Sequence, residues 1–282
     1  MENLIPNRLS TLGHPQRLAL FRLLMRRYPD RVPATELAQA LGIKANTLST
    51  YVNALMQAGL ITQERVGTSL RYAIDTQAAR ETFDYLLLDC CRGRPEICAS
   101  LTSAEGVGRH PEAGKKYKVL FICTGNSARS IFAECILRDL GGDRFEVHSA
   151  GRKPRAEVNP FAAELLTRKG HDVAPLRPKN ISEYMGADAP VFDFVFTVCN
   201  QAANEECPPW SGQTVSAHWG MPDPVSVTGS EAEQSLAFQQ TYGALRNRLV
   251  AFTALPLAAL DRMSLQKAVD EIGQTHKEGI PE

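Results

Sequence analysis

The sequence predicts two domains, a mainly α-helical domain over residues 1–100 and an α/β domain with a central parallel sheet over residues 117–257. The chain has 282 residues, which is enough for two separate cores. Helical apolar spacing followed by a hairpin characterises the first part, whereas strands and helices alternate in the second part, as in a parallel sheet covered by helices. Residues 101–116 lack periodicity and predict a linker, and residues 258–282 predict a C-terminal helix and tail.

Two helices joined by a glycine form the centre of the first domain. A helix over residues 34–41 ends at Gly42, and a second helix covers about residues 45–58. This spacing is typical of a helix-turn-helix unit. Residues 60–66 and 69–74 then flank Gly67-Thr68, which predicts a hairpin, so the domain is expected to be a winged helix-turn-helix.

Two more helices complete this domain. One begins near Pro15, and the other covers residues 78–91. The latter is a common dimerisation element in winged-helix domains, so we expect a homodimer.

Four strands and three helices are predicted within the second domain, and a fourth helix follows it. The strands cover residues 117–122, 145–149, 192–198 and 214–216, and the helices cover residues 130–137, 159–169, 231–253 and 258–275.

A cysteine and an arginine six residues apart enclose the loop between the first strand and helix of this domain. Cys123 ends the strand, and Arg129 lies at the start of the helix. A tight turn into a helix N-terminus directs backbone N–H groups at one point, and an arginine adds a planar fork of donors, which together suit a tetrahedral oxyanion. Such a field lowers the pKa of a cysteine, so Cys123 is predicted to be a thiolate nucleophile. The oxyanion-binding residues are expected to be Thr124, Gly125, Asn126, Ser127, Ala128 and Arg129.

Three later residues add to this chemistry. Asp223 precedes a proline, and an Asp-Pro step on a loop suits a general acid. Cys199 follows a buried strand, and strand ends of α/β sheets face the ligand crevice. Cys207 lies eight residues later, so the two thiols could pass a disulfide outward from Cys123.

The helix over residues 45–58 presents short polar side chains that suit base edges and phosphates. The hairpin adds two arginines within reach of the DNA backbone or minor groove. The predicted DNA-binding residues are Asn46, Thr47, Ser49, Thr50, Asn53, Arg65 and Arg71.

Cys90, Cys91 and Cys98 close the first domain. Two adjacent thiols and a third after a turn can surround one soft ion, and As(III) favours three thiolates. No histidine lies among them to complete a four-ligand zinc site, so we expect an As(III) site.

The overall composition limits the partners and the cellular compartment that we expect for this protein. The formal net charge is 0, but residues 1–100 carry 12 Lys+Arg against 9 Asp+Glu, a mild excess that permits binding to nucleic acid. No apolar run has the length of a membrane span, and no signal-peptide pattern is seen. The seven cysteines are therefore expected in a reducing cytoplasm.

Residues 117–255 resemble the low-molecular-weight protein tyrosine phosphatase superfamily, and more closely its arsenate reductase branch. The resemblance lies in the segment Val119 to Ser130, in Ser149-Ala150-Gly151, Val158-Asn159-Pro160 and Phe196 to Cys199, and in His218-Trp219-Gly220 with Asp223-Pro224. Phosphatases of this superfamily usually place tyrosines after the Asp-Pro step, where this chain has Val225-Ser226-Val227.

The resemblance implies a phosphatase-like fold and an arsenate reductase mechanism. Cys123 would attack arsenate, Asp223 would protonate the leaving hydroxide, and Cys199 would release arsenite by forming a disulfide that passes to Cys207. Ser130 resembles the hydroxyl that bonds to the nucleophile. Asn126, Glu134 and Ser149 fall where some members bind K⁺, so K⁺ is a candidate ion, and no tightly bound cofactor is expected. The gap between Cys199 and Cys207 is longer than in the best-known thioredoxin-linked members, so the reductant is either thioredoxin or glutathione with glutaredoxin.

Residues 5–98 resemble the ArsR family of metal- and metalloid-responsive repressors, over Leu12 to Leu18 and Thr47 to Leu55. The resemblance implies a homodimer that binds operator DNA and leaves it when As(III) binds. The sequence thus predicts an arsenic-responsive repressor fused to a thiol-dependent arsenate reductase. Two alternatives remain open, a low-molecular-weight protein tyrosine phosphatase and a regulator whose second domain only senses an oxyanion.

Overall fold

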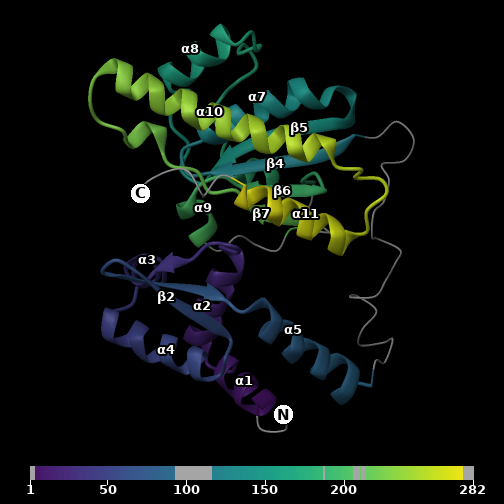
Figure 1. Cartoon of the computed structure of the whole chain (residues 1–282). Helices are drawn as coiled ribbons and strands as arrows, with labels where there is room; N and C mark the ends of the chain where they lie inside the picture. Colours follow the sequence, from purple (N-terminus) through teal and green to yellow (C-terminus); the bar gives the residue numbers. More distant parts are fainter. Residues whose placement is uncertain (1–3, 93–115, 187, 206–209, 211–213, 276–282) are drawn as a thin grey trace. The chain divides into compact units, whose positions relative to one another are not determined.

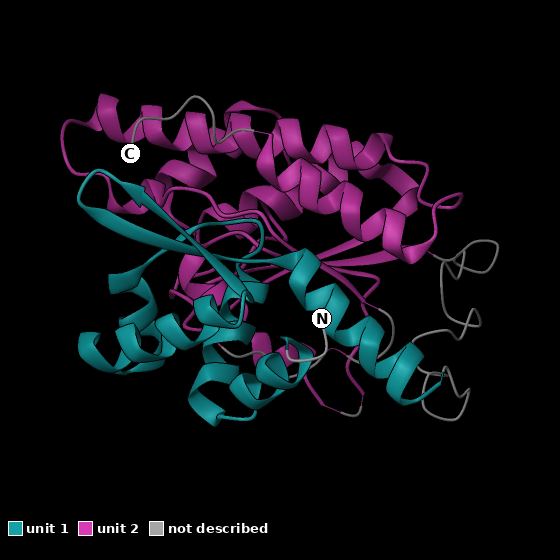
Figure 2. Ribbon diagram, turned by 60° about the horizontal axis from the view of Figure 1, so that its bottom comes forward, with its two compact units in different colours: residues 1–105 teal, residues 106–282 magenta. Residues whose placement is uncertain are grey.

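The structure is a computed structural model that describes residues 4–92, 116–186, 188–205, 210 and 214–275. It divides into two compact units, residues 1–105 and residues 106–282 (Figure 2). The predicted linker, except Lys116, lies outside the described residues, as do Cys98 and Cys207.

The first unit combines helices with a small antiparallel sheet, in the strand order β1-β3-β2. Its elements are α1 (Leu4–Leu12), α2 (Pro15–Arg26), β1 (Val32–Pro33), α3 (Ala34–Leu41), α4 (Ala45–Gln57), β2 (Ile61–Val66), β3 (Ser69–Ile74), α5 (Thr76–Asp84) and a π-helix, η1 (Tyr85–Cys90).

The helix-turn-helix and the hairpin are present as predicted. Gly42 ends α3 with φ 64°, a left-handed conformation that glycine adopts without steric cost. Strands β2 and β3 pair in antiparallel register from Ile61 opposite Ile74 to Val66 opposite Ser69. The predicted winged helix-turn-helix class is confirmed.

The predicted helix over residues 78–91 is different in detail. It begins earlier, because Asp75 caps it by accepting a hydrogen bond from the backbone N–H of Ala78 (2.9 Å). It then changes to π-helical winding, in which the N–H of Cys91 bonds to the carbonyl of Leu86 (2.9 Å).

The second unit is an α/β domain, whose class is also confirmed. Its elements are β4 (Tyr117–Cys123), α7 (Arg129–Gly141), η3 (Gly142–Arg144), β5 (Phe145–Gly151), α8 (Pro160–Arg168), η4 (Ile181–Tyr184), β6 (Phe194–Thr197), α9 (Asn200–Asn204), β7 (Val215–His218), η5 (Pro224–Ser226), α10 (Glu231–Ala254) and α11 (Arg262–Gln274).

The four strands of the second unit are all parallel, in the order β5-β4-β6-β7. Helices α7, α8 and α10 pack against one another, and α11 packs along β7 (Figure 1). Apolar rings fill the core, where Phe196 stacks on Trp219 with ring centroids 4.1 Å apart. Because the strands are parallel, their carboxyl ends meet at one edge of the sheet, where the next segments of the chain begin.

No helix in the described ranges combines the length and the apolar character that a membrane crossing requires.

Candidate functional site

Cys123 lies at the carboxyl end of β4, inside a loop that folds around its sulfur. The backbone N–H of Asn126 donates to Sγ of Cys123 (3.0 Å), and Oγ of Ser130 lies 2.9 Å from the same sulfur. Asn126 has φ 43°, and this left-handed residue turns the loop back over the thiol. The chain then enters α7 at Arg129, so the predicted strand, loop and helix are all present.

Hydrogen bonds from the side chain of Asn126 hold the loop. Its amide donates to Oγ of Ser130 and to Oγ of Ser149 (both 2.8 Å), and its carbonyl accepts from the backbone N–H of Lys179 (2.6 Å). Asn126 and Ser149 have no exposed surface. The loop is therefore preorganised by buried polar contacts.

Gly151, at the end of β5, allows the chain to pass close to this loop. A Cβ atom at Gly151 would lie 2.7 Å from the carbonyl oxygen of Thr124. Only glycine fits this approach, which explains why Ser149-Ala150-Gly151 accompanies the loop.

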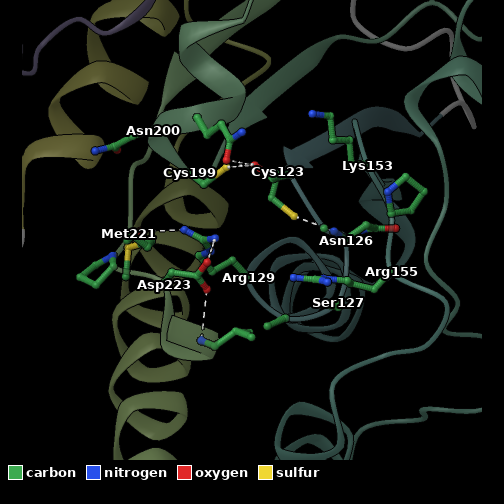
Figure 3. A pocket seen from close by; sticks show the side chains of 17 residues that line it. Cys123, Asn126, Ser127, Arg129, Lys153, Arg155, Cys199, Asn200, Met221 and Asp223 are labelled. Carbon is green, nitrogen blue, oxygen red and sulfur yellow. Dashed lines mark hydrogen bonds and ion pairs between the residues drawn. The ribbon is translucent and has the colours of Figure 1, made fainter. Parts of the chain in front are cut away.

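Arg129 and Asp223 form an ion pair, with 2.8 Å between Nη2 and Oδ2 (Figure 3). The other terminal nitrogen of Arg129 donates to the carbonyl of Met221 (3.1 Å). Asp223 also caps η5 by accepting from the N–H of Val225 (3.1 Å). The arginine expected to bind an anion is thus paired with the carboxylate expected to act as an acid.

Cys199 follows β6 and is the N-cap of α9. Its sulfur accepts from the N–H of Ala202 and lies near Oγ1 of Thr124 (both 3.4 Å). Both Cys123 and Cys199 are free thiols, are buried, and line one cavity (Figure 3). Cys207, the predicted third member, lies outside the described residues.

The expected lowering of the Cys123 pKa is wrong for this state of the site. Burial and the neighbouring Cys199 raise the pKa of the Cys123 thiol, against the lowering effects of Ser130, Arg129 and the N–H of Asn126. Burial has the largest influence, because an ion in an apolar interior loses its hydration. The pairing of Arg129 with Asp223 also offsets the nearest positive charge.

Glu134 and Ser149, where K⁺ is a candidate, have a different cation beside them. The ammonium of Lys179 lies 2.9 Å from Glu134 Oε2, and Ser149 donates to the same oxygen. The side chains of Lys179 and Glu134 are each only 9% exposed. A lysine ammonium therefore supplies positive charge at this cluster.

Sequence reasoning missed Lys179, Lys153 and Arg155. Lys153 and Arg155 line the cavity that contains both thiols. A detectable signal was present, since Arg152-Lys153-Pro154-Arg155 is a basic run that begins three residues after the predicted strand over residues 145–149. Lys179 offered no comparable local signal, because it meets Glu134 across 45 residues.

His218 connects segments of the chain next to the site. It is buried, and its ring nitrogens bond to Oγ1 of Thr197 (2.8 Å) and Oδ1 of Asn200 (3.2 Å). These bonds tie the end of β7 to the end of β6 and the start of α9.

The cavity has a volume of about 630 Å³. Its lining comprises residues 123–129, 153–155, 199–201 and 221–223 with Val225. Loops after all four strands contribute, and none of these side chains is aromatic. The arrangement brings the loop of residues 123–129, two thiols and one carboxyl group together in a single space.

The residues predicted to bind DNA are grouped on α4 and the hairpin. Asn46, Ser49, Thr50 and Asn53 are exposed on α4, and Thr47 is half-buried. The hydroxyls of Ser49 and Thr50 bond to the carbonyls of Ala45 (3.0 Å) and Asn46 (3.2 Å) of the same helix.

The hairpin arginines differ in their surroundings. Arg65 is exposed on β2, whereas Arg71 is half-buried on β3, opposite Glu64 in the strand register. Arg65 is thus the more accessible of the two.

Cys90 is exposed and Cys91 is half-buried at the end of the π-helix. Cys98 lies outside the described part of the chain. Among the residues that the structure describes, no group of three or more His, Cys, Asp or Glu side chains is suited to hold a metal ion. The predicted As(III) site thus remains a prediction.

The fold and the cysteine loop define a phosphatase-type α/β domain with a thiol nucleophile position. Residues 118–267, which are 150 of the 282 residues, match the family described as low molecular weight phosphotyrosine protein phosphatase, and the chain belongs to this family. Residues 12–64 match a helix-turn-helix domain family.

Relatives of the second unit include proteins named arsenate reductase. One from Bacillus subtilis is 34% identical over 134 residues, which are 48% of this chain and 93% of the relative. One from Staphylococcus epidermidis is 33% identical over 121 residues, which are 43% of this chain and 87% of the relative. A solved structure of an arsenate reductase in oxidized state is 25% identical, covers 49% of this chain and 96% of its own, and has a TM-score of 0.40.

Proposed function

We propose that the second unit reduces arsenate to arsenite with Cys123 as the nucleophile. The observation that carries the proposal is the presence of a second buried thiol, Cys199, in the cavity of Cys123. A phosphatase or a simple oxyanion sensor has no need of this thiol, whereas a two-electron reduction requires two. The relatives named arsenate reductase support the same substrate.

The reaction begins with arsenate in the loop, held by backbone N–H groups and by Arg129, which exchanges its bond to Asp223 for the anion. The Cys123 thiolate, which accepts a hydrogen bond from Ser130, attacks arsenic. Asp223, which arsenate displaces from Arg129, takes up a proton from solvent and donates it to an arsenate hydroxyl, which leaves as water.

Reduction occurs in the second step. The Cys199 thiolate attacks Sγ of Cys123, the sulfur–sulfur bond forms, and the electron pair of the sulfur–arsenic bond stays on arsenic, which leaves as arsenite. Two thiols are oxidised to one disulfide, and As(V) gains two electrons. Cys207 then attacks Cys199 and passes the disulfide to an external reductant, either thioredoxin or glutathione with glutaredoxin, in the reducing cytoplasm.

A single-turnover experiment tests this proposal. The fully reduced chain is mixed with arsenate without added thiol, quenched in denaturant to free any trapped arsenite, and analysed for arsenite and for protein disulfide. We expect arsenite from wild type and from Cys135→Ser, a matched control because Cys135 is buried in α7 outside the cavity. Cys199→Ser is expected to give none, and arsenite release by that variant would exclude the two-thiol mechanism.

We further propose that the first unit is an arsenic-responsive repressor, with Asn46, Thr47, Ser49, Thr50, Asn53, Arg65 and Arg71 at operator DNA. Exposed apolar side chains near its end support a homodimer, since Phe83 is 49% exposed and Leu88 is 68% exposed.

The inducer would be As(III) bound by Cys90, Cys91 and Cys98. Fluorescence anisotropy on fragments of the DNA upstream of the gene tests this role, with arsenite added to the bound complex. Arsenite is expected to release wild type but not a variant with the three cysteines changed to serine. Absence of binding to any upstream fragment would overturn the repressor role.

A further inference from the structure

The cavity around the two thiols is larger than a tetrahedral oxyanion requires. Its volume of about 630 Å³ lies in the range of cavities that hold organic ligands. The loop that would bind arsenate, residues 123–129, supplies only part of its lining. The rest of the lining comes from other segments, which include two cationic side chains, Lys153 and Arg155 (Figure 3).

Backbone hydrogen bonds place these two cations beside the nucleophile loop. The N–H of Arg152 donates to the carbonyl of Cys123 (3.2 Å), that of Lys153 to Thr124 (2.9 Å), and that of Arg155 to Gly125 (2.9 Å). Lys153 and Arg155 are thus positioned by the same loop that surrounds the Cys123 sulfur. Their place next to the site is a property of the backbone and not of flexible side chains alone.

Lys153 and Arg155 also represent a surplus of positive charge. Asp223 is the one carboxylate in the lining, and it pairs with Arg129. Within the described residues, neither the Lys153 nor the Arg155 side chain has an ion-pair or hydrogen-bond partner. By contrast, Arg152 forms an ion pair with Glu205. The outer cavity therefore favours an anion in addition to the one bound in the loop.

Access to the thiols favours a small reductant. Cys123 is 3% exposed and Cys199 is 2% exposed, so a thiol on a folded protein surface cannot approach either sulfur in this conformation. A small thiol can enter through the cavity that both sulfurs line.

We propose that the outer cavity binds a low-molecular-weight thiol that carries carboxylate groups, with Lys153 and Arg155 as its binding residues. This inference rests on the proposed reductase function and specifies its reductant. In this route the small thiol takes the place of Cys207 as the group that resolves the Cys123–Cys199 disulfide. One thiolate of this class attacks that disulfide, which forms a mixed disulfide and frees one protein thiolate. A second thiolate attacks the mixed disulfide, which frees the other protein thiolate and yields the small-molecule disulfide. Two electrons enter the protein, and the two protons of the small thiols restore Cys123 and Cys199.

Steady-state reduction of arsenate by the full chain tests the proposal with three thiols: glutathione, which carries two carboxylates, neutral 2-mercaptoethanol, and cationic cysteamine. Wild type is compared with Lys153→Gln/Arg155→Gln and with the control Arg168→Gln/Lys267→Gln. The control removes two exposed cations of the same unit outside the cavity.

We expect the cavity variant to lower kcat/KM for glutathione about tenfold, as the loss of two exposed ion pairs would. The value for 2-mercaptoethanol should stay within about twofold, because a neutral ligand gains little from either cation. The kcat/KM of the cavity variant for cysteamine should be equal to or higher than that of wild type. Arsenate is common to all three assays, so an effect on arsenate binding alone would lower all three rates equally.

Two results would overturn the thiol subsite. One is an equal loss with all three thiols, and the other is a wild-type chain that releases arsenite in a single turnover but is not recycled by glutathione. The single-turnover assay needs no external thiol, so failure of the reductase itself would be seen there and is separate from failure of the subsite.

Discussion

Lys179 donates a hydrogen bond to Glu134 from 45 residues away, with 2.9 Å between Nζ and Oε2 and both side chains 9% exposed. Glu134 also accepts from Ser149, which accepts in turn from Asn126 in the nucleophile loop. The ammonium is therefore linked to the loop through two further side chains. Two cationic side chains, those of Lys179 and Arg138, thus face the Glu134 carboxylate.

We expect arsenate reduction to be independent of K⁺. The kcat/KM measured in KCl and in NaCl at equal ionic strength should agree, because the Lys179 ammonium already faces Glu134. Lys179→Ala should lower the free energy of unfolding by about 1–3 kcal/mol, since the buried Glu134 carboxylate loses one of its two cationic partners and keeps Arg138. Added K⁺ should then stabilise this variant more than choline does. Strong activation of wild type by K⁺ would contradict the assignment.

Asp223→Asn is expected to separate binding from catalysis. The substitution removes the negative charge that pairs with Arg129, so inorganic phosphate should inhibit the variant at lower concentration than wild type. At the same time kcat should fall about a hundredfold, because the amide cannot donate the proton that the leaving oxygen needs.

The control for this experiment is Glu157→Gln, an exposed carboxylate outside the cavity, which should change neither value. An Asp223→Asn variant with weaker phosphate inhibition and unchanged kcat would show that Asp223 only holds Arg129.

Cys199 should control the pH at which Cys123 reacts. Burial, and after it Cys199, raises the pKa of the Cys123 thiol above its ordinary value. Cys199→Ser removes one of these influences and should move the alkylation profile of Cys123 to lower pH. Iodoacetamide labelling followed by mass spectrometry measures it. A profile that stays in place or moves upward would contradict the coupling.

The same raised pKa has a consequence for stability. The folded state favours the neutral Cys123 thiol over the thiolate. The resulting contribution to the free energy of unfolding is fully present below the ordinary cysteine pKa. It is lost as the pH rises through the folded-state value.

Arg248 should stabilise the segment that leads to Asp223. Its side chain is buried in α10 and donates to the carbonyls of Trp219 and Gly273 (both 3.0 Å), which joins that segment to α11. Arg248→Met leaves these carbonyls without their charged donor and should cost about 2–4 kcal/mol. The exposed Arg246→Met on the same helix should cost less than about 0.5 kcal/mol.

Tryptophan fluorescence during urea unfolding measures this effect, because both tryptophans, Trp210 and Trp219, belong to the second unit. Equal stabilities of the two variants would show that the Arg248 contacts contribute little.

Local patterns were sufficient for much of the fold. Gly42 between two amphipathic segments predicted the helix-turn-helix, and Gly67-Thr68 predicted the hairpin, because turn chemistry and periodicity act over a few residues. The same holds for Cys123 and Arg129, which are six residues apart in a strand, loop and helix. Helix α1 and the two-residue strand β1 were missed. Arg8 of α1 is buried and donates to the carbonyls of Ala58 (3.2 Å) and Ala78 (3.0 Å). Partners so distant in the sequence leave no local pattern near α1.

The sequence by itself determined most of the helices and strands, the parallel class of the second unit's sheet and the residue types of the site. The tertiary structure alone decided which charges meet: Arg129 with Asp223, and Lys179 with Glu134. It also decided the direction of the Cys123 pKa shift, because desolvation depends on every segment that covers the sulfur. Strand, turn and helix signals are local in the chain, whereas burial and charge pairing depend on distances in space that sequence separation does not set.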